Sequence, residues 1–462
     1  MAPPPSLPDG LLVAWYGDDY TGAAAVMEVL TFAGLASVLF FNVPTPEQLQ
    51  RFTNVRGIGI AGSARSRSPA WMGEELPPVF AFLAGLNAQL FHYKICSTLD
   101  SSPAIGSIGR AAELAFAATG APWAAVYPAA PAIGRYQAFG NLFAISGEDV
   151  HRLDRHPVMA RHPVTPMDEA DIGGHLTRQT DLPFGLVGLD ALASAPEATE
   201  RLARERDRGA RMIAIDTVDD RTLSHAGHLI WQADGQPRLA IGSQGVEYAL
   251  VRHWQDQGLL PETQPTPRAE PVDRIVAVAG SASATTGAQI EWAEANGFTA
   301  TRVDPRGALE VGAAYGNWVQ SAVNGALAAA GSPIVFSARG PDDASIAAFK
   351  SAGEAAGMAP EEANERLGVG LGDILARLIE RTGCQRAAIA GGDTSSHAAQ
   401  RLGIFALTAL AATVPGAALC QAHRDHTETA PLEVALKGGQ MGTLEYFGQI
   451  RNGGATNQGS KS

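Results

Sequence analysis

Two acids and a hydroxyl follow the first apolar run of the chain, where a predicted strand passes into a helix. The run Leu11–Tyr16 is followed by GDDYTGA at residues 17–23. Ligands of open α/β sheets bind at the carboxyl edge of the strands, and paired carboxylates there can accept hydrogen bonds from a polyol or hold a magnesium ion. A helix cap would explain one of the acids but not the pair. We therefore predict that Asp18, Asp19 and Thr21 bind a ligand.

A second polar segment, KICSTLDSSP at residues 94–103, also follows a predicted strand and precedes a glycine-bearing helix start. It brings a cation, several hydroxyls and an acid to the same predicted edge. Serine and threonine clusters are also ordinary in loops, but their position after a strand favours a functional role. We predict that Lys94, Ser97 and Asp100 contribute to the substrate site.

A proline- and glycine-rich loop, PAAPAIGRYQAFG at residues 128–140, follows a further predicted strand and contains one cation, Arg135. An arginine fork matches a carboxylate in a bidentate way, so Arg135 is a candidate for binding an acidic substrate. An exposed arginine is more often simply solvated. The sequence leaves open whether Lys94 or Arg135 takes a substrate carboxylate.

Glycine-rich turns stand out in the second half of the chain. The segment GSASATT at residues 280–286 lies between a predicted strand and a helix. Small residues let the backbone approach a phosphate, and the amide groups of a helix N-terminus supply hydrogen-bond donors. A tight capped turn would use similar residues, so both interpretations stay open for Ser281 and Ser283.

A sharper pattern is AGGDTSS at residues 390–396, directly after the predicted strand Arg386–Ala390. Its acid, Asp393, can act as the catalytic base for a substrate hydroxyl or ligate magnesium, the two roles of acids in phosphoryl transfer. A helix cap is the alternative. A third segment, LKGGQMG at residues 436–442, adds a lysine and three glycines. The phosphate-binding residues predicted in these two segments are Gly391, Gly392, Thr394, Gly438 and Gly439.

Other cofactor sites are disfavoured by what the sequence lacks. No GxxxxGKS or GxxxxGKT is present, so the phosphate site is not a P-loop, and no GxGxxG follows the first strand, which disfavours a dinucleotide site. His423 and His426 have no third ligand at metal-site spacing, and no metal site is predicted. The three cysteines are odd in number and far apart, which fits a reducing compartment, the cytoplasm, better than a disulfide framework.

The elements that must position these segments follow from hydrophobic patterning. Short apolar runs alternate with longer amphipathic segments, as in parallel strands joined by crossover helices. The predicted strands are Leu11–Tyr16, Val38–Phe41, Gly57–Ala61, Phe91–Cys96, Ala124–Tyr127, Phe184–Leu189, Met212–Asp216, Arg274–Ala279, Pro333–Ser337 and Arg386–Ala390. The clearest predicted helices are Ala23–Phe32, Gly106–Ala118, Thr199–Arg208 and Asn364–Arg381.

Two domains are expected, because 462 residues exceed what one ordinary hydrophobic core accommodates. Residues 255–272 read QDQGLLPETQPTPRAEPV, in which prolines and polar residues interrupt all periodicity. We therefore predict a first domain over residues 1–256, a linker over 257–272, a second domain over 273–452 and a flexible tail over 453–462. The fold class is α/β, and each domain is a mostly parallel sheet flanked by helices.

The charge and hydropathy patterns exclude two classes of partner. The formal net charge is −13 and no dense lysine or arginine run occurs, which argues against nucleic acid as a partner. No apolar run reaches 18 residues, and the N-terminus MAPPPSLPDG lacks the pattern of an export signal, so neither membrane insertion nor export is expected. A small anionic ligand is compatible with this charge, because it needs only a few local donors.

Taken together and in order, GDDYTGA, KICSTLD, GSASATTGAQ, GGDTS and LKGGQMG resemble motifs of the four-carbon acid sugar kinase family, once known only as a domain of unknown function. The resemblance spans nearly the whole chain. It implies an N-terminal domain that binds a sugar acid and a C-terminal domain that binds ATP and Mg²⁺, with transfer of the γ-phosphate to a terminal hydroxyl in the cleft between them. By this resemblance the acidic motif at residues 17–23 is on the substrate side. The nucleotide loops include Ser281, Ser283, Gly391, Gly392, Gly438 and Gly439.

One segment departs from the family pattern. Threonate, erythronate and oxo-tetronate kinases typically show K-x-D-S-T-L-R-G where this chain has KICSTLDS, so Cys96 stands for an acid and Asp100 for an arginine. This inverts local charge at the substrate loop. A branched acid such as 3-oxo-isoapionate is therefore as tenable a substrate as 3-oxo-tetronate, threonate or erythronate. The alternatives are an NAD(P)-dependent oxidoreductase of sugar acids and a non-catalytic sensor, and the sequence allows a homo-oligomer.

Overall fold

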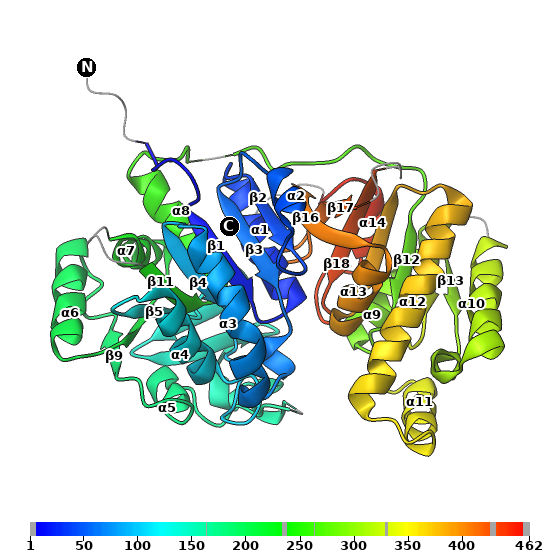
Figure 1. Cartoon of the computed structure of the whole chain (residues 1–462), viewed down its shortest axis with the longest axis horizontal. Coiled ribbons are helices and arrows are strands. Elements are labelled where there is room, and N and C mark those ends of the chain that lie inside the picture. The colour runs from blue at the N-terminus through cyan, green and yellow to red at the C-terminus, as the bar shows by residue number, and fades with distance from the viewer. Residues whose placement is uncertain are drawn as a thin grey trace. The chain divides into compact units, whose positions relative to one another are not determined.

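The computed structural model describes residues 6–162, 164–232, 238–262, 264–328, 331–425 and 431–455. The chain divides into two compact units, Met1–Pro265 and Thr266–Ser462 (Figure 1). Each unit has a β-sheet with helices packed against it, as the alternating pattern predicts. Within the described part, none of the helices combines the length and the apolar character that a membrane span needs.

The large sheet of the first unit is parallel and has the strand order β2-β3-β1-β4-β11-β5-β10-β9. Its strands are β1 Val13–Gly17, β2 Ser37–Phe40, β3 Gly57–Ala61, β4 Leu90–Lys94, β5 Ala124–Tyr127, β9 Phe184–Val187, β10 Met212–Ile215 and β11 Arg238–Gly242. Its α-helices are α1 Tyr20–Phe32, α2 Pro46–Gln50, α3 Pro69–Gly85, α4 Ile108–Thr119, α5 Ile172–Leu176, α6 Ala195–Asp207, α7 Asp220–Trp231 and α8 Gly245–Asp256.

Strand β1 illustrates how the sequence produces this sheet. Every residue of β1 is buried, because helices cover both faces of a parallel sheet, and such a strand reads as a continuous apolar run. Trp15 of β1 packs against Gly59 of the neighbouring strand β3. A Cβ atom at Gly59 would lie 2.0 Å from the indole of Trp15, so the glycine makes room for the ring.

A small antiparallel sheet of β6 Arg135–Ala138, β7 Asn141–Ser146 and β8 Asp149–Arg152 extends from the first unit, and the sequence analysis did not predict it. Buried Asp216 holds its first turn. The Asp216 carboxylate accepts hydrogen bonds from the amides of Gly140 and Leu189, both at 3.0 Å. It also accepts a hydrogen bond from Gln137 Nε2 at 3.2 Å. This carboxylate therefore fixes the hairpin that begins with Arg135.

The sheet of the second unit has the order β13-β14-β12-β15-β18-β17-β16. The first five strands in this order are parallel, β17 is antiparallel to β18, and β16 is antiparallel to β17. Its strands are β12 Val276–Ala279, β13 Phe298–Arg302, β14 Ser332–Phe336, β15 Arg386–Ala390, β16 Ile404–Ala411, β17 Leu419–Arg424 and β18 Leu432–Lys437. Its α-helices are α9 Ala284–Ala295, α10 Gly312–Leu327, α11 Ala344–Ala355, α12 Pro360–Thr382, α13 Gly392–Arg401 and α14 Tyr446–Arg451. The expectation of two mostly parallel α/β domains is thus confirmed.

The segment predicted as a linker, residues 257–272, is tied to the second unit over its last residues. The amide of Val272 donates to the carbonyl of Arg451 at 2.9 Å. Buried Arg386, at the start of β15, donates to the carbonyl of Glu270 at 2.8 Å. The boundary between the units follows Pro265, so the last residues of the predicted linker belong to the second unit. Of the predicted tail, residues 456–462 lie outside the described part of the structure.

Candidate active site

The acids of the first unit face an arginine that the sequence analysis missed. Arg65 lies in the 3₁₀ turn η1 Ala64–Ser66, directly after β3. Its Nη2 atom is 3.0 Å from Asp18 Oδ1 and 2.8 Å from Asp19 Oδ1. The signal was present, because Arg65 follows the predicted strand Gly57–Ala61 just as Asp18 follows β1. What the sequence does not reveal is that β3 and β1 are neighbours.

The two acids differ in their electrostatic state. Burial raises the pKa of the Asp18 carboxyl, and Arg65 opposes this rise only in part. Burial acts on Asp19 in the same direction, but Arg65 and Lys94 outweigh it and hold the pKa of Asp19 below its usual value. Asp19 is therefore the fixed carboxylate of the pair, and Asp18 is the acid that takes up a proton more readily.

Asp19 also caps α1, which places Thr21 in a supporting role. Its Oδ1 accepts from the amide of Gly22 at 2.9 Å, and its Oδ2 accepts from Thr21 Oγ1 at 2.8 Å. A Cβ atom at Gly22 would lie 2.7 Å from Lys94 Nζ. The glycine therefore lets buried Lys94, at the end of β4, approach the acidic motif, and three of the predicted substrate residues lie together with Lys94.

The loop after β4 forms a chain of polar contacts. Thr98 Oγ1 donates to Asp100 Oδ1 at 2.7 Å, and Cys96 Sγ lies 3.0 Å from Thr98 Oγ1. Burial and the charge of Asp100 raise the pKa of the Cys96 thiol. Cys96 is therefore a neutral thiol at neutral pH, and Ser97 lies half-buried beside it.

Arg135 faces the same loop from β6. Burial lowers the pKa of its guanidinium, and the charge of Asp100 opposes that effect. Its Nη1 atom donates to the carbonyls of Ile133 and Gly134 at 3.2 and 3.1 Å. The Nε groups of Arg135 and Arg65 are both buried, and neither has a hydrogen-bond partner within the described part of the chain. Two arginine donors are thus left for a ligand of the first unit.

In the second unit the three predicted glycine turns follow three adjacent strands. In the strand register, Ala279 of β12 pairs with Ala390 of β15, and Ala390 pairs with Lys437 of β18. The strands therefore end at the same level. The amide of Gly280 donates to the carbonyl of Ala390 at 3.0 Å, and the amide of Gly391 donates to the carbonyl of Lys437 at 2.9 Å.

Close contacts between these turns require glycine at defined positions. A Cβ atom at Gly439 would lie 2.4 Å from Ser281 Oγ. A Cβ atom at Gly280 would lie 2.2 Å from Thr394 Oγ1. Gly391 has φ +127°, a backbone conformation that side chains disfavour. The turns therefore approach one another through their backbones.

The turns of the second unit present backbone groups that suit a phosphate chain. Helices α9 and α13 begin at the first and second turns, and the first amides of a helix have no partner within it. Ser283 caps α9 by accepting from the amide of Thr286 at 3.0 Å. Gly392 is exposed at the start of α13, and the side chain of Asp393 lies outside the described part of the structure. Among the described residues, no group of three or more His, Cys, Asp or Glu side chains can hold a metal ion.

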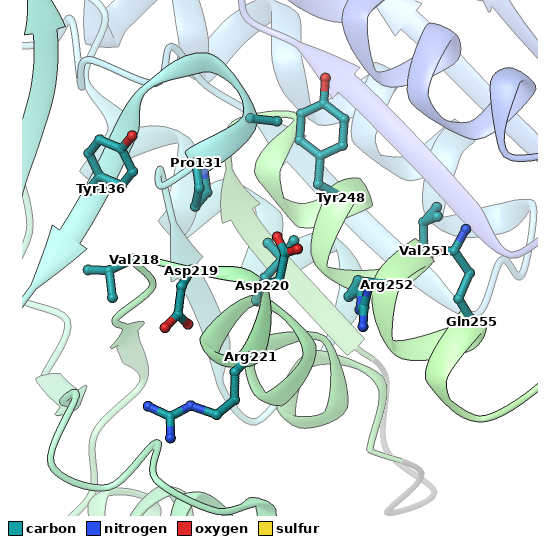
Figure 2. A pocket seen from close by; sticks show the side chains of 12 residues that line it. Pro131, Tyr136, Val218, Asp219, Asp220, Arg221, Tyr248, Val251, Arg252 and Gln255 are labelled. Carbon is teal, nitrogen blue, oxygen red and sulfur yellow. The ribbon is translucent and has the colours of Figure 1, made fainter. Parts of the chain in front are cut away.

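A surface cavity of about 760 Å³ in the first unit is distinct from these residues. It is lined by η2 Pro131–Ile133, β6, the start of α7 and one face of α8. Figure 2 shows its lining side chains, among them Tyr136, Asp219 and Tyr248. None of the predicted substrate residues lines it, and Arg135 and Tyr136 are successive residues of a strand, whose side chains point to opposite faces.

Comparison with known proteins agrees with this division. Residues 13–250 match the family described as the sugar-binding N-terminal domain, and residues 276–447 match the nucleotide-binding C-terminal domain. The chain is 45% identical over 448 residues to a 3-oxo-isoapionate kinase from Paraburkholderia graminis, which covers 96% of this chain and 95% of the relative. It is 30% identical over 440 residues to a 3-oxo-tetronate kinase from Cupriavidus necator, and this alignment covers 94% of this chain and 95% of the relative.

Solved structures share the fold. A crystal structure from Salmonella typhimurium LT2 aligns with a TM-score of 0.75 at 23% identity and covers 94% of this chain and 97% of the other. A Haemophilus influenzae protein of the DUF1537 family aligns with a TM-score of 0.69 at 23% identity and covers 94% of this chain and 98% of the other.

The contact chain of the substrate loop predicts the reactivity of Cys96. Because the charge of Asp100 raises the pKa of the Cys96 thiol, Asp100→Asn lowers that pKa. We expect iodoacetamide to alkylate Cys96 several-fold faster at pH 8 in this variant, since the thiolate is the nucleophile. Mass spectrometry measures the rate, with Cys384 as the reference in the same sample. Asp181→Asn, at an exposed acid, is the matched control. An unchanged Cys96 rate in Asp100→Asn would contradict this electrostatic coupling.

Proposed function

The chain belongs to the four-carbon acid sugar kinase family and is an ATP-dependent kinase of a small sugar acid, and we propose that its acceptor is the branched acid 3-oxo-isoapionate, phosphorylated on a terminal hydroxyl. The observation that carries this proposal is that the Nε donors of Arg65 and Arg135 are buried without a partner among the described residues, with Asp18 and Asp19 against Arg65. The 3-oxo-isoapionate kinase among the relatives supports the choice of acid.

In this proposal the cations of the first unit bind the acid and its carboxylates bind the hydroxyls. Arg135 takes the substrate carboxylate, because its hydrogen-bond partners among the described residues are backbone carbonyls rather than acids. Arg65 adds its free Nε donor. Asp18 and Asp19 accept hydrogen bonds from hydroxyls, and Lys94 and Arg65 keep Asp19 ionised for this purpose.

The loop of Cys96 and Asp100 gives a reason for a substrate other than a linear tetronate. Its neutral thiol carries no charge that a substrate must balance. Asp100 is an acceptor, already bonded to Thr98, and cannot itself hold a carboxylate. The loop therefore leaves the carboxylate to Arg135 and presents acceptor oxygens and a thiol to the remainder of the acid. That division fits an acid with additional hydroxyl or oxo groups on a branched carbon.

On the nucleotide side, the three glycine turns hold the phosphates of ATP, with donors from Ser281 and Thr394 and with Ser283 as the cap of α9 beside them. Mg²⁺, when bound, neutralises charge on the phosphate oxygens. Because Mg²⁺ is commonly held by one or two carboxylates together with substrate phosphates, Asp393 is the residue of the GGDTS turn suited to it or to the base. We propose Asp393 as the base that accepts the proton of the acceptor hydroxyl. The reaction requires the two half-sites to meet during the catalytic cycle.

We place the reaction in the cytoplasm. The cysteines Cys96, Cys384 and Cys420 are free thiols, as is usual in a reducing compartment. A homo-oligomer, which the sequence allows, stays a prediction.

The substrate assignment is tested by a panel of acids. We expect ADP formation to require an acid, and kcat/KM for 3-oxo-isoapionate to exceed those for 3-oxo-tetronate, threonate and erythronate at least about tenfold, the effect of one lost polar contact. A coupled assay of ADP release measures each rate. A preference for a tetronate would overturn the choice of acid. Acid-independent ADP release, or turnover with NAD(P), would overturn the kinase proposal.

The carboxylate role of Arg135 predicts a selective loss of acid binding. Arg135→Met should raise KM for the sugar acid about ten- to a hundredfold, because it removes charge-assisted hydrogen bonds, and should leave KM for ATP unchanged. Arg155→Met, at an exposed arginine of the same unit, is the control and should behave as the wild type. Initial rates over both substrate concentrations give the two constants. A normal KM for the acid in Arg135→Met would leave Lys94 as the carboxylate ligand.

The base role of Asp393 predicts a loss of turnover without a loss of nucleotide. Asp393→Asn keeps the size of the side chain but cannot accept the proton, so kcat should fall about a hundredfold or more. ATP affinity, measured by calorimetry, should change much less. Near-normal turnover would remove Asp393 from the reaction. A parallel loss of ATP affinity and turnover would assign it to holding Mg²⁺ and the phosphates instead.

A further inference from the structure

Lys437 is a buried cation whose charge the described side chains do not balance. It ends β18, and its side chain is fully buried. Its Nζ atom donates to Thr286 Oγ1 at 2.9 Å and to the carbonyls of Gly438 and Gly439 at 3.1 and 3.3 Å. Within the described part of the chain it forms no ion pair with a carboxylate. A buried ammonium is costly unless its surroundings or a ligand compensate it.

The three donors of this ammonium have three acceptors. A lysine ammonium has three N–H groups and no acceptor, and Thr286, Gly438 and Gly439 take one each. The ammonium is thus directed at the turn and at Thr286. Burial also lowers the pKa of Lys437 to about 8. These contacts suit a residue that orients the turn rather than one that touches the nucleotide.

The carbonyl of Gly439 has two further donors. Ser283 Oγ donates to it at 2.5 Å and Thr286 Oγ1 at 2.9 Å, both from the start of α9. The carbonyl of Gly438 also accepts from the amide of Met441 at 3.2 Å, which closes the turn. Two successive carbonyls of the glycine turn are therefore drawn toward Lys437 and α9 by side chains from two elements.

This arrangement fixes the direction of two amides. The described peptide bonds are all trans, and in a planar trans peptide the N–H points opposite to the C=O. The amides of Gly439 and Gln440 belong to the same peptide groups as the carbonyls of Gly438 and Gly439. They therefore point away from Lys437, and within the described part neither is bonded to a backbone carbonyl.

We propose that Lys437 is a positioning residue that, with Thr286 and Ser283, holds the carbonyls of Gly438 and Gly439 so that the amides of Gly439 and Gln440 bind a nucleotide phosphate. This inference rests on the proposed function. We call the side chains of Lys437, Thr286 and Ser283 the carbonyl clamp. It explains why a lysine precedes the two glycines: its side chain reaches back over the turn, and the glycines leave the peptide groups free to take this orientation.

Four variants and one control test the carbonyl clamp through ATP affinity measured by calorimetry on the full chain. Lys437→Met and the isosteric Thr286→Val should each raise the Kd of ATP about ten- to a hundredfold, because they release the same two peptide groups. The Kd of ATP for the double variant should be at most about threefold higher than that of the weaker-binding single variant, because the effects of coupled sites are not additive. Thr286→Ser retains the hydroxyl and should rescue binding. Lys350→Met removes an exposed positive charge from the same unit and should bind as the wild type.

Hydrogen exchange separates orientation from general loss of structure. At saturating ATP, the wild type should gain protection in peptides covering residues 436–446 and 280–290. In Thr286→Val and Lys437→Met, ATP should still protect residues 280–290 but no longer residues 438–441. The carbonyl clamp would be overturned if ATP protected residues 438–441 in these variants as strongly as in the wild type, or if the losses of ATP affinity were additive in the double variant. If Lys437→Met does not fold, Thr286→Val and Thr286→Ser decide alone. ATP protecting neither segment of the wild type would instead overturn the nucleotide role of this unit.

Discussion

The alignment of strand ends in a parallel sheet is the constraint on which both half-sites depend. In the first unit, Gly17 of β1 is in register with Ala61 of β3 on one side and with Lys94 of β4 on the other. The residues that follow these strands therefore start from one level. In the second unit the ends of β12, β15 and β18 are aligned in the same way. Segments that are more than a hundred residues apart in places thus meet at one edge of the sheet, which is where ligands of open α/β sheets bind.

The two units solve the problem of charge near a sheet edge in opposite ways. The first unit pairs acids with cations, since Arg65 contacts Asp18 and Asp19 together. Burial still raises the pKa of Asp18, so the pairing is incomplete, and the Nε donors of Arg65 and Arg135 have no partner among the described residues. The described part of the second unit places one buried cation, Lys437, among neutral oxygens. Its site is built from peptide dipoles, whose direction is set by the groups that hold the carbonyls.

Sequence reasoning located most strands that carry the site because they are buried on both faces and read as apolar runs, as in β1 and β15. It located the polar segments after them for the same reason. It missed Arg65, because neighbouring strands are a long-range property of the sheet, and β3 becomes the neighbour of β1 only in the fold. It also missed β11, the sheet of β6 to β8, and strands β13, β16, β17 and β18 of the second unit. Strand β6 is only partly buried, so it leaves no apolar run in the sequence. Its turn is held by Asp216, which is far away in the sequence, so the turn leaves no local pattern either.

The different construction of the half-sites bears on how substrate choice can change. In the proposed function the acid is recognised by side chains, and the contact chain from Cys96 through Thr98 to Asp100 lies in one loop. An exchange of side chain there alters charge beside Arg135 while the fold of the loop is retained. In the same proposal the phosphates meet backbone amides, so the sequence requirement at that site consists of glycines and of the groups that orient peptide bonds. A chain of this family can therefore acquire a new acid through a few side chains of the first unit, while the glycine turns of the second unit stay fixed by their geometry.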